Sequence, residues 1–365
     1  MVVPFARVRP TAIDLFAGAG GATAGLRKAG FQVIAAAEND SAAAESYAAN
    51  HPGVLLGGDV RLIEPGALGR FLGLSRGGLD LLKACPPCQG FSSLARGETD
   101  VQRNDLVLDL YRFVRQLVPR AVLLENVPGL AKDERLELLL AALGRLGYRH
   151  ARYRVDARQF GVPQRRRRLI VVAVRGDVPA ELPEALTDGL PDWFDTSPQT
   201  AGQALQELVA NLHMDDPQNR YRTSSPKVRA RIAAIPVGGR RADLPEEHRL
   251  ACHGRLARGG RPVRGQATSS YGRVKAGEAA PTMTTRCTTA ACGAFVHPTE
   301  DRGLTLREAA AFQTFPHDYV FEGGYDAVER QIGNAVPVRM AQGLGLTVRR
   351  LLGDVLASQE RGITG

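Results

Sequence analysis

The sequence predicts an α/β protein, with an open sheet of buried strands and a smaller irregular region. Short apolar runs alternate along the first half of the chain with segments whose apolar residues recur at helical spacing. From about residue 175 the pattern becomes irregular and rich in Pro, Gly and Arg, and regularity returns at 304. We therefore expect a large domain at 1–178, a smaller domain at 179–324 and a C-terminal segment at 325–365 that returns to the large domain.

Length and composition set the class of protein. The chain has 365 residues, 44% of them hydrophobic, which is enough for a large and a small domain with sizeable cores. No apolar run approaches the length of a membrane span, and residues 1–7 lack the apolar core of a signal peptide. Five cysteines, an odd number, argue against a disulfide framework and favour a reducing cytoplasm.

Positive charge is concentrated in residues 219–275. This segment holds 14 Lys and Arg residues against three acidic residues, an excess larger than the net charge of +9 of the whole chain. A solvated surface would also explain a basic segment, but an excess of this size favours a polyanionic partner. We therefore expect a face that binds nucleic acid.

The first strand is predicted at residues 11–16. A turn that contains Gly18, Gly20 and Gly21 connects this strand to a helix that ends at Gly30. Glycines at such a turn let the backbone approach a ligand closely at a helix N-terminus. Many nucleotide-binding folds share this pattern, and the spacing differs from the dinucleotide-binding fingerprint.

A second strand is predicted at residues 31–37 and ends in Glu38. An acidic side chain at this position can accept hydrogen bonds from both hydroxyls of a ribose. Asp40 or Ser41 caps the helix that follows. Asp59 ends a third segment, where it can bind a ligand or act as an ordinary turn residue.

Two cysteines follow the next apolar run, at residues 79–84, in the stretch Cys85-Pro86-Pro87-Cys88. Half a zinc site or a redox pair is an alternative for such a spacing. However, the sequence has no second Cys-x-x-Cys or His-x-x-x-His to complete a metal site, and redox pairs rarely contain two prolines. We therefore expect no metal, and we interpret Cys88, just past the end of a strand, as a nucleophile.

The second half of the large domain continues the alternation. We expect a helix at 105–117, a buried strand at 121–124 that ends in Glu125, a helix at 133–146 and a strand at 148–157. Four arginines, at 165–168, lead into a strand at 169–174. Because side chains alternate along a strand, some of these arginines should point into the crevice at the strand ends where Cys88 and Glu125 are expected.

Two helices are predicted near the C-terminal end. The first, within 304–316, begins with a capping box in which Thr305 is followed three residues later by Glu308. The stretch 331–337 is expected to open the second helix, with Pro337 near its start.

Taken in order, these segments resemble the motifs of the DNA cytosine-5 methyltransferases. The similar stretches are Asp-Leu-Phe-Ala-Gly-Ala-Gly-Gly at 14–21, Pro-Cys-Gln-Gly-Phe-Ser at 87–92, Glu-Asn-Val at 125–127, Gln-x-Arg-x-Arg at 164–168 and the stretch at 331–337. The resemblance implies a Rossmann-like S-adenosylmethionine-dependent methyltransferase with a mixed sheet and a smaller target-recognition domain. It also implies S-adenosylmethionine as cofactor and a short double-stranded DNA sequence as substrate.

The same resemblance assigns the site residues. Cys88 would add to carbon 6 of a cytosine flipped out of the duplex, Glu125 would bond ring nitrogen 3 and the exocyclic amine, and Arg166 and Arg168 would complete the catalytic set. The residues implied at the cofactor are Asp14, Phe16, Gly18, Gly20, Gly21, Glu38, Asp59, Val60, Pro87, Asn334 and Val336. The residues implied at the DNA are Gln89, Ser92, Gln164, Arg165, Tyr271, Thr284, Thr285 and Arg286. For those beyond residue 270, ordinary strands and turns of the small domain explain the sequence equally well.

Three alternatives fit the sequence less well than a DNA methyltransferase. A tRNA cytosine-5 methyltransferase of the same family would typically carry a Cys-Phe-Thr signature, which the sequence lacks. An inactive DNA-binding relative would not need Cys88, Glu125 and Arg168 together, and a nicotinamide enzyme would need the dinucleotide fingerprint. We expect a monomer in the bacterial cytoplasm, associated with the nucleoid, with a restriction endonuclease as possible companion and no membrane contact.

Overall fold

The computed structural model describes residues 9–87, 106–211, 215–250 and 269–353. The chain forms two compact units, the first made of 1–155, 167–195 and 338–365 and the second of 156–166 and 196–337. The chain therefore leaves the first unit at residue 156, returns at 167, and after a long excursion returns again at 338. We describe each unit separately.

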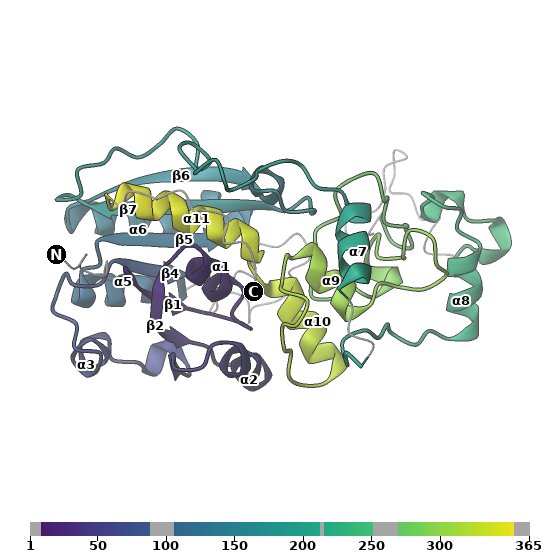
Figure 1. Cartoon of the computed structure of the whole chain (residues 1–365), viewed down its shortest axis with the longest axis horizontal. Coiled ribbons are helices and arrows are strands. Elements are labelled where there is room, and N and C mark those ends of the chain that lie inside the picture. Colours follow the sequence, from purple (N-terminus) through teal and green to yellow (C-terminus); the bar gives the residue numbers. More distant parts are fainter. Residues whose placement is uncertain (1–8, 88–105, 212–214, 251–268, 354–365) are drawn as a thin grey trace, which may run out of the picture. The chain divides into compact units, whose positions relative to one another are not determined.

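The first unit is built on a seven-stranded sheet in the order β3-β2-β1-β4-β5-β7-β6 (Figure 1). Strand β1 pairs in parallel with β2 and β4, as do β2 with β3 and β4 with β5, whereas β7 is antiparallel to β5. The sheet is therefore mixed, which confirms the predicted fold class. The strands are β1 (Thr11–Leu15), β2 (Gln32–Ala37), β3 (Leu55–Gly57), β4 (Leu81–Ala84), β5 (Ala121–Asn126), β6 (Tyr148–Asp156) and β7 (Arg167–Arg175).

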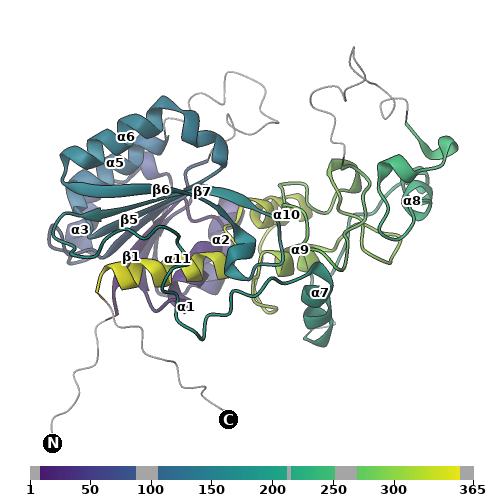
Figure 2. The same cartoon turned by 90° about the horizontal axis from the view of Figure 1, so that it is seen from above.

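Helices cover both faces of this sheet, as the view along its edge shows (Figure 2). One face carries α3 (Pro65–Phe71), α5 (Leu106–Leu117) and α6 (Glu134–Arg145). The other carries α1 (Gly21–Lys28), α2 (Ser41–Asn50) and α11 (Val338–Leu351). Helix α1 packs closely on α11, because a Cβ atom at Gly25 would lie 2.4 Å from the Val338 carbonyl oxygen. Short 3₁₀ segments connect elements of this unit at Val60–Leu62 and Pro128–Lys132.

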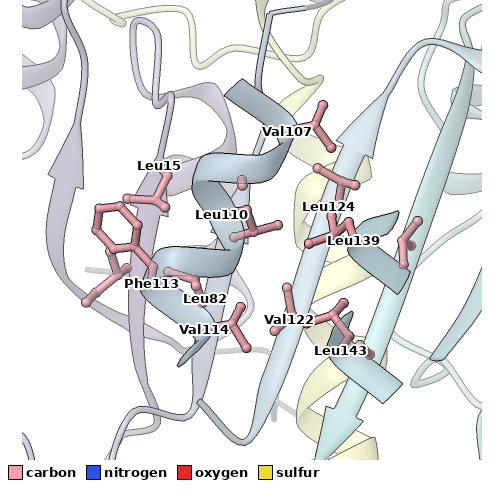
Figure 3. Close-up of a cluster of buried hydrophobic side chains, with 14 of the residues drawn as sticks. Leu15, Leu82, Val107, Leu110, Phe113, Val114, Val122, Leu124, Leu139 and Leu143 are labelled. Carbon is pink, nitrogen blue, oxygen red and sulfur yellow. The ribbon is translucent and has the colours of Figure 1, made fainter. Parts of the chain in front are cut away.

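A large hydrophobic core fills the space between the sheet and helices α5 and α6 (Figure 3). Alternate residues of the strands face it, including Leu15 of β1, Leu82 of β4 and Leu124 of β5, all buried. Phe113 of α5 lies among them and is fully buried. The residues between these positions, such as Asp14 and Lys83, therefore face the opposite side of the sheet.

The second unit contains four α-helices within its described residues, α7 (Ala201–Ala210), α8 (Pro226–Ala233), α9 (Leu306–Phe312) and α10 (Tyr325–Asn334). Its described residues also contain four short 3₁₀ segments, at Ala157–Phe160, Arg241–Asp243, Glu246–His248 and Ala290–Cys292. The predicted capping box is confirmed, since Thr305 Oγ1 accepts from the Glu308 amide at 3.0 Å and the Thr305 amide donates to Glu308 at 2.8 Å. No helix in the described ranges combines the length and the apolar character that crossing a membrane requires.

One predicted helix is confirmed only in part. The helix expected with Pro337 near its start is α11, which begins at Val338, but residues 331–334 form the last turn of α10 and do not belong to it. Ala335 has an extended backbone and ends α10, so the chain changes direction between two helices. Pro337, immediately before Val338, had suggested a helix start, and the helix it introduces begins one residue later.

Candidate active site

The glycine turn after β1 adopts the backbone conformation that its residues favour. Gly18 and Gly20 have φ angles of 58° and 92°, and Phe16 also lies in the left-handed region, at 58°. Gly20 is the N-cap of α1, and no side chain caps that helix end. A Cβ atom at Gly18 would meet nothing within 4 Å. The turn therefore leaves open space beside its backbone, next to a helix N-terminus.

Glu38 follows β2 directly, and backbone donors hold its carboxylate. Gly18 donates its N–H to Oε2 at 2.7 Å, and the amides of Asn39 and Asp40 donate to Oε1 at 3.0 and 2.8 Å. A carboxylate offers about four lone-pair positions, so capacity remains for a ligand hydroxyl. The carboxylate is thus fixed beside the glycine turn, as binding a ribose would require.

Asp59 and Val60 lie beyond the end of β3. Asp59 caps the 3₁₀ turn through the Arg61 amide at 2.9 Å, and the Arg61 guanidinium pairs with its carboxylate. These hydrogen bonds hold the pKa of Asp59 below its ordinary value. Val60 is buried. Phe16, Gly18, Glu38 and Asp59 thus all follow carboxyl ends of parallel strands, the usual ligand edge of such sheets.

Beneath the glycine turn lies a buried ion pair that the sequence analysis missed. Lys83 donates to Asp14 Oδ1 at 2.7 Å, with only 3% and 0% of the two side chains exposed. Asp14 Oδ2 accepts from the Thr23 hydroxyl at 2.8 Å, and Tyr47 lies 3.0 Å from the same hydroxyl. A lysine inside an otherwise apolar run, at 79–84, was the available signal.

The segment that leads toward Cys88 is held at several points. The Cys85 amide donates to the Leu15 carbonyl at 3.2 Å, and Asn126 Nδ2 donates to the Pro86 carbonyl at 3.1 Å. Asn126 is the last residue of β5, so two neighbouring strands anchor this segment. Pro87 is half-buried. Three predicted site residues lie outside the described residues: Cys88, Gln89 and Ser92.

Glu125 and Arg168 come together at the end of β5. Arg168 Nε lies 2.9 Å from Glu125 Oε1, and their side chains are 12% and 10% exposed. The contact is an ion pair without hydrogen-bond alignment, so Oε1 accepts no hydrogen bond within the described part of the chain. Because β7 runs antiparallel to β5, the start of β7 lies beside the end of β5, which places Arg168 there. Burying a carboxylate oxygen without a hydrogen bond costs free energy unless a ligand donates a hydrogen bond to it.

The four arginines alternate as predicted, with Arg165 and Arg167 exposed and Arg166 buried. Arg166 donates to the carbonyl oxygens of Met283 and Gly333, at 2.9 and 3.2 Å, inside the second unit. Its guanidinium therefore holds the segment at 283 against α10. The catalytic role expected for Arg166 stays a prediction.

Gln164 is also engaged inside the second unit. The side chain is fully buried, donates to the Phe312 carbonyl and to Gln313 Oε1, and accepts from the Met283 amide at 3.0 Å. Its amide already has three partners in the folded chain. Arg165 pairs with Glu278 at 3.2 Å and is half exposed. Both predicted DNA contacts stay untested, and the exposed arginine has the accessibility that such a contact needs.

The other predicted residues of the second unit differ in accessibility. Tyr271 is buried in a small hydrophobic cluster with a left-handed φ of 56°, and Arg231 donates to its hydroxyl at 3.2 Å. Thr284 and Thr285 are half-buried, and Arg286 is exposed. Two predicted cofactor residues lie here as well: Asn334 is exposed and Val336 is buried.

Part of the basic segment serves the fold. Arg273, with 3% of its side chain exposed, donates to the carbonyl oxygens of Ile235, His297 and Glu300 at 2.9, 3.1 and 2.7 Å, and pairs with Asp301. The basic residues of the segment that are exposed in the described ranges are Arg220, Lys227, Arg229, Arg240, Arg249 and Lys275. No group of three or more potential metal ligands occurs within the described residues.

Comparisons with known proteins agree with this geometry. Residues 11–349 match the family described as C-5 cytosine-specific DNA methylase. The type II methylase M.HgiDII of Herpetosiphon aurantiacus is 32% identical over 349 residues, covering 93% of this chain and 95% of that protein. The type II methyltransferase M.Eco47II of Escherichia coli is 34% identical over 365 residues, covering 94% and 80%.

Solved structures show the same fold. A protein described as a DNA modification methyltransferase encoded within an E. coli prophage has a TM-score of 0.68 and 25% identity, covering 94% of this chain and all of that one. The Dnmt2 methyltransferase of S. pombe, at 17% identity, has a TM-score of 0.66 and covers 95% of this chain and all of that one.

Proposed function

The chain belongs to the C-5 cytosine-specific DNA methylases, and on that premise we propose that it methylates carbon 5 of a flipped-out cytosine in one short duplex sequence. The proposal includes a covalent adduct through Cys88 and a role as the modification enzyme of a type II restriction-modification system, as in the names of its relatives. The observation that carries it is the buried Glu125 Oε1, which is paired with Arg168 and accepts no hydrogen bond within the described residues.

A thiol is needed because carbon 5 of cytosine is a poor nucleophile. Addition of the Cys88 thiolate at carbon 6 forms a carbon–sulfur bond and leaves electron density at carbon 5. After methylation, the carbon 5 proton leaves and the carbon–sulfur bond breaks, which restores the aromatic ring and the thiolate. The sequence and the structure assign no residue to the removal of that proton.

Glu125 serves the addition step in this proposal. A carboxyl group that bonds ring nitrogen 3 and the exocyclic amine draws electrons from the ring, so carbon 6 accepts the thiolate more readily. Arg168 fixes the carboxyl group from the side, at 2.9 Å, and leaves Oε1 without a hydrogen bond from the described chain. The two residues therefore have separate tasks: Glu125 contacts the base and Arg168 orients Glu125.

The enzyme uses S-adenosylmethionine, whose sulfonium methyl group is the electrophile of the reaction when the cofactor is bound. The residues present fit a nucleoside with a charged amino-acid tail. Glu38 would accept hydrogen bonds from the ribose hydroxyls, and Asp59 would accept from the adenine amino group. The turn at Gly18 and Gly20 would let the tail approach the N-terminus of α1.

DNA recognition is proposed to reside in the second unit. Exposed Arg286, with the half-buried Thr284 and Thr285, offers donors and acceptors for base edges and phosphates. Exposed Lys227 and Arg229 of α8 would add contacts to phosphates. A stacked cytosine hides carbon 6, so flipping, at a cost of a few kcal/mol, must precede attack.

Bisulfite sequencing tests this function directly. Unmethylated bacterial genomic DNA is incubated with the protein and S-adenosylmethionine, in parallel with the Cys88→Ser variant. We expect protected cytosines within one short sequence for the parent chain and none for the variant, with cofactor binding retained in both. Protection by Cys88→Ser would refute the covalent route. If the parent chain gave no protection although it bound cofactor, a tRNA substrate or an inactive binding role would replace the proposal.

We also propose that the protein acts as a monomer in the bacterial cytoplasm, close to the nucleoid and beside a restriction endonuclease of the same specificity. The type II names of its relatives support this setting. Size-exclusion chromatography with light scattering would reveal a dimer if the monomer is wrong.

A further inference from the structure

Lys83 is a charged residue in a place where a strand normally carries an apolar one. It lies opposite Asp14 in the register of β1 and β4, and both side chains project away from the large core. Removing two charges from water is costly, and their mutual attraction does not reliably stabilise the fold more than an apolar pair would. Stability alone is therefore a weak reason for this pair, and its neighbours suggest another.

The pair has one partner group on each side. On the side of Asp14, Thr23 of α1 donates to Oδ2, so the carboxylate is tied to the helix that begins at the glycine turn. On the other side, Cys85 follows Lys83 by two residues and its amide continues the ladder of β4 with β1, so the two side chains project to the same face of the sheet, where the ammonium interacts with the Cys85 thiol. Lys83 thus connects the structure under the cofactor turn with the first residue after β4.

We propose that Lys83 is a positioning residue, whose ammonium holds the Cys85 side chain and thereby orients the segment leading to Cys88 relative to the cofactor turn. The inference rests on the proposed function, because it presumes that Cys88 is the nucleophile. Lys83 acts through Cys85 and touches neither the base nor the cofactor.

The backbone after Cys85 is constrained, so the orientation of Cys85 determines that of the residues that follow it. The Cys85 amide is bonded to the Leu15 carbonyl, and the Pro86 carbonyl is bonded to Asn126, so the backbone is held on both sides of the residue. Pro86 and Pro87 have φ fixed near −65°, which leaves few ways for the chain to absorb a rotation. A displaced Cys85 would therefore displace the residues that follow. A misplacement of about 1 Å at a reacting group can lower a rate about a hundredfold.

The charge states suit this role. Burial, with the nearby charges of Glu125 and Asp14, raises the pKa of the Cys85 thiol well above its usual range, despite the opposing effect of Lys83. Burial alone would lower the pKa of Lys83, but the interactions with Asp14 and Cys85 together outweigh it and the ammonium keeps its proton. A neutral thiol therefore accepts a hydrogen bond from a cation, and Cys85 does not compete with Cys88 as a thiolate.

The test compares Cys85→Ala with Cys85→Ser, because serine keeps an acceptor for the ammonium and alanine does not. Both leave the Asp14–Lys83 ion pair intact, so both should fold. In single-turnover methyl transfer to unmethylated genomic DNA, we expect Cys85→Ala to be about tenfold slower and Cys85→Ser to stay within about threefold of the parent. The dissociation constant of S-adenosylmethionine should be unchanged in both, which separates positioning from cofactor binding.

A partly exposed ion pair at the amino ends of the same strands provides the control. Arg120 donates to Asp80 at 2.9 Å, and Asp80 also accepts from the Thr11 amide, so this pair ties together the amino ends of the same strands. The double variant Asp80→Asn/Arg120→Met should unfold at lower urea concentration with transfer unchanged. The double variant Asp14→Asn/Lys83→Met should lose about tenfold in transfer beyond any change in its unfolding midpoint.

Hydrogen exchange supplies a readout that does not need catalysis. The Cys85 amide should exchange faster in Cys85→Ala than in the parent and in Cys85→Ser, with peptides from α5 unchanged. Equal exchange and equal transfer in the alanine and serine variants would overturn the inference. A parent chain without methyl transfer would refute the proposed function, and the exchange comparison would still decide whether Lys83 orders this segment.

Discussion

Protonation of His51 should weaken the fold around the cofactor turn. His51 is buried, its Nε2 lies 3.1 Å from the Gly20 carbonyl oxygen, and its Nδ1 lies 3.4 Å from an Arg27 nitrogen. This arrangement requires a neutral ring, with the proton on Nε2 donated to Gly20 and Nδ1 accepting from Arg27. Burial, reinforced by the charge of Arg27, lowers the pKa of His51 from 6.5 to about 4.

The size and the sign of the effect follow from this pKa. Between pH 6.5 and about 4 the unfolded chain binds a proton at His51 that the folded chain does not bind. The free energy of unfolding is therefore at its full value above pH 6.5 and falls as the pH drops toward 4. At pH 5 the loss amounts to about 2 kcal/mol relative to pH 7.5.

Urea denaturation of the parent and of His51→Gln, at pH 7.5 and at pH 5, isolates this contribution. Glutamine can donate to Gly20 and accept from Arg27 but does not titrate, and all other ionisable groups are common to both proteins. We expect the parent to lose about 2 kcal/mol more than His51→Gln on acidification. If both proteins lose the same amount, His51 is not held neutral and the reasoning is wrong.

Three further predictions concern other parts of the chain. Glu125→Gln should slow single-turnover methyl transfer about a hundredfold with cofactor affinity unchanged, and a loss below threefold would contradict its assignment. Iodoacetamide at pH 8 should modify exposed Cys292 but spare Cys287, because burial raises the pKa of the Cys287 thiol. Mass spectrometry of the protein labelled with and without urea measures this difference, and equal labelling of both cysteines in the folded protein would contradict the prediction. Arg273→Met should lower the free energy of unfolding by about 3 kcal/mol, because it removes a buried, hydrogen-bonded guanidinium. Exposed Arg229→Gln should change the free energy of unfolding by no more than about 0.5 kcal/mol but weaken DNA binding at low salt. The reverse pattern would refute the structural role of Arg273 and the DNA-binding role of Arg229.

Local patterns in the sequence were sufficient for most of the first unit. Its strands are short apolar runs with ends marked by glycine or acidic residues, and the predicted positions agree with β1, β2, β5 and β7 within about two residues. Asp40 caps α2 through the Ala43 amide at 3.0 Å, one of the two residues expected there. These features depend on neighbours along the chain, so one sequence contains the information needed to predict them.

The stretch 331–337 shows the limit of local patterns. Pro337 correctly marks the start of α11, but residues 331–334 before it belong to the end of α10 and not to the same helix. A helix end and a helix start one turn apart produce the same residue pattern, and the direction of the chain between them depends on contacts with distant segments. Gly333, for example, lies against the Thr284 backbone so closely that a Cβ atom would not fit.

The amino-acid sequence thus determined the α/β class, the order of the segments and the residue types gathered at the strand ends. Tertiary structure alone decided which of these groups meet: the Arg168–Glu125 pair, the internal bonds of Arg166 and Gln164, and the burial of Lys83 against Asp14. The physical reason is strand pairing. The register of β1 with β4 and of β5 with β7 brings side chains together that are separated by about 70 and 40 positions in the chain, and no local periodicity encodes those distances.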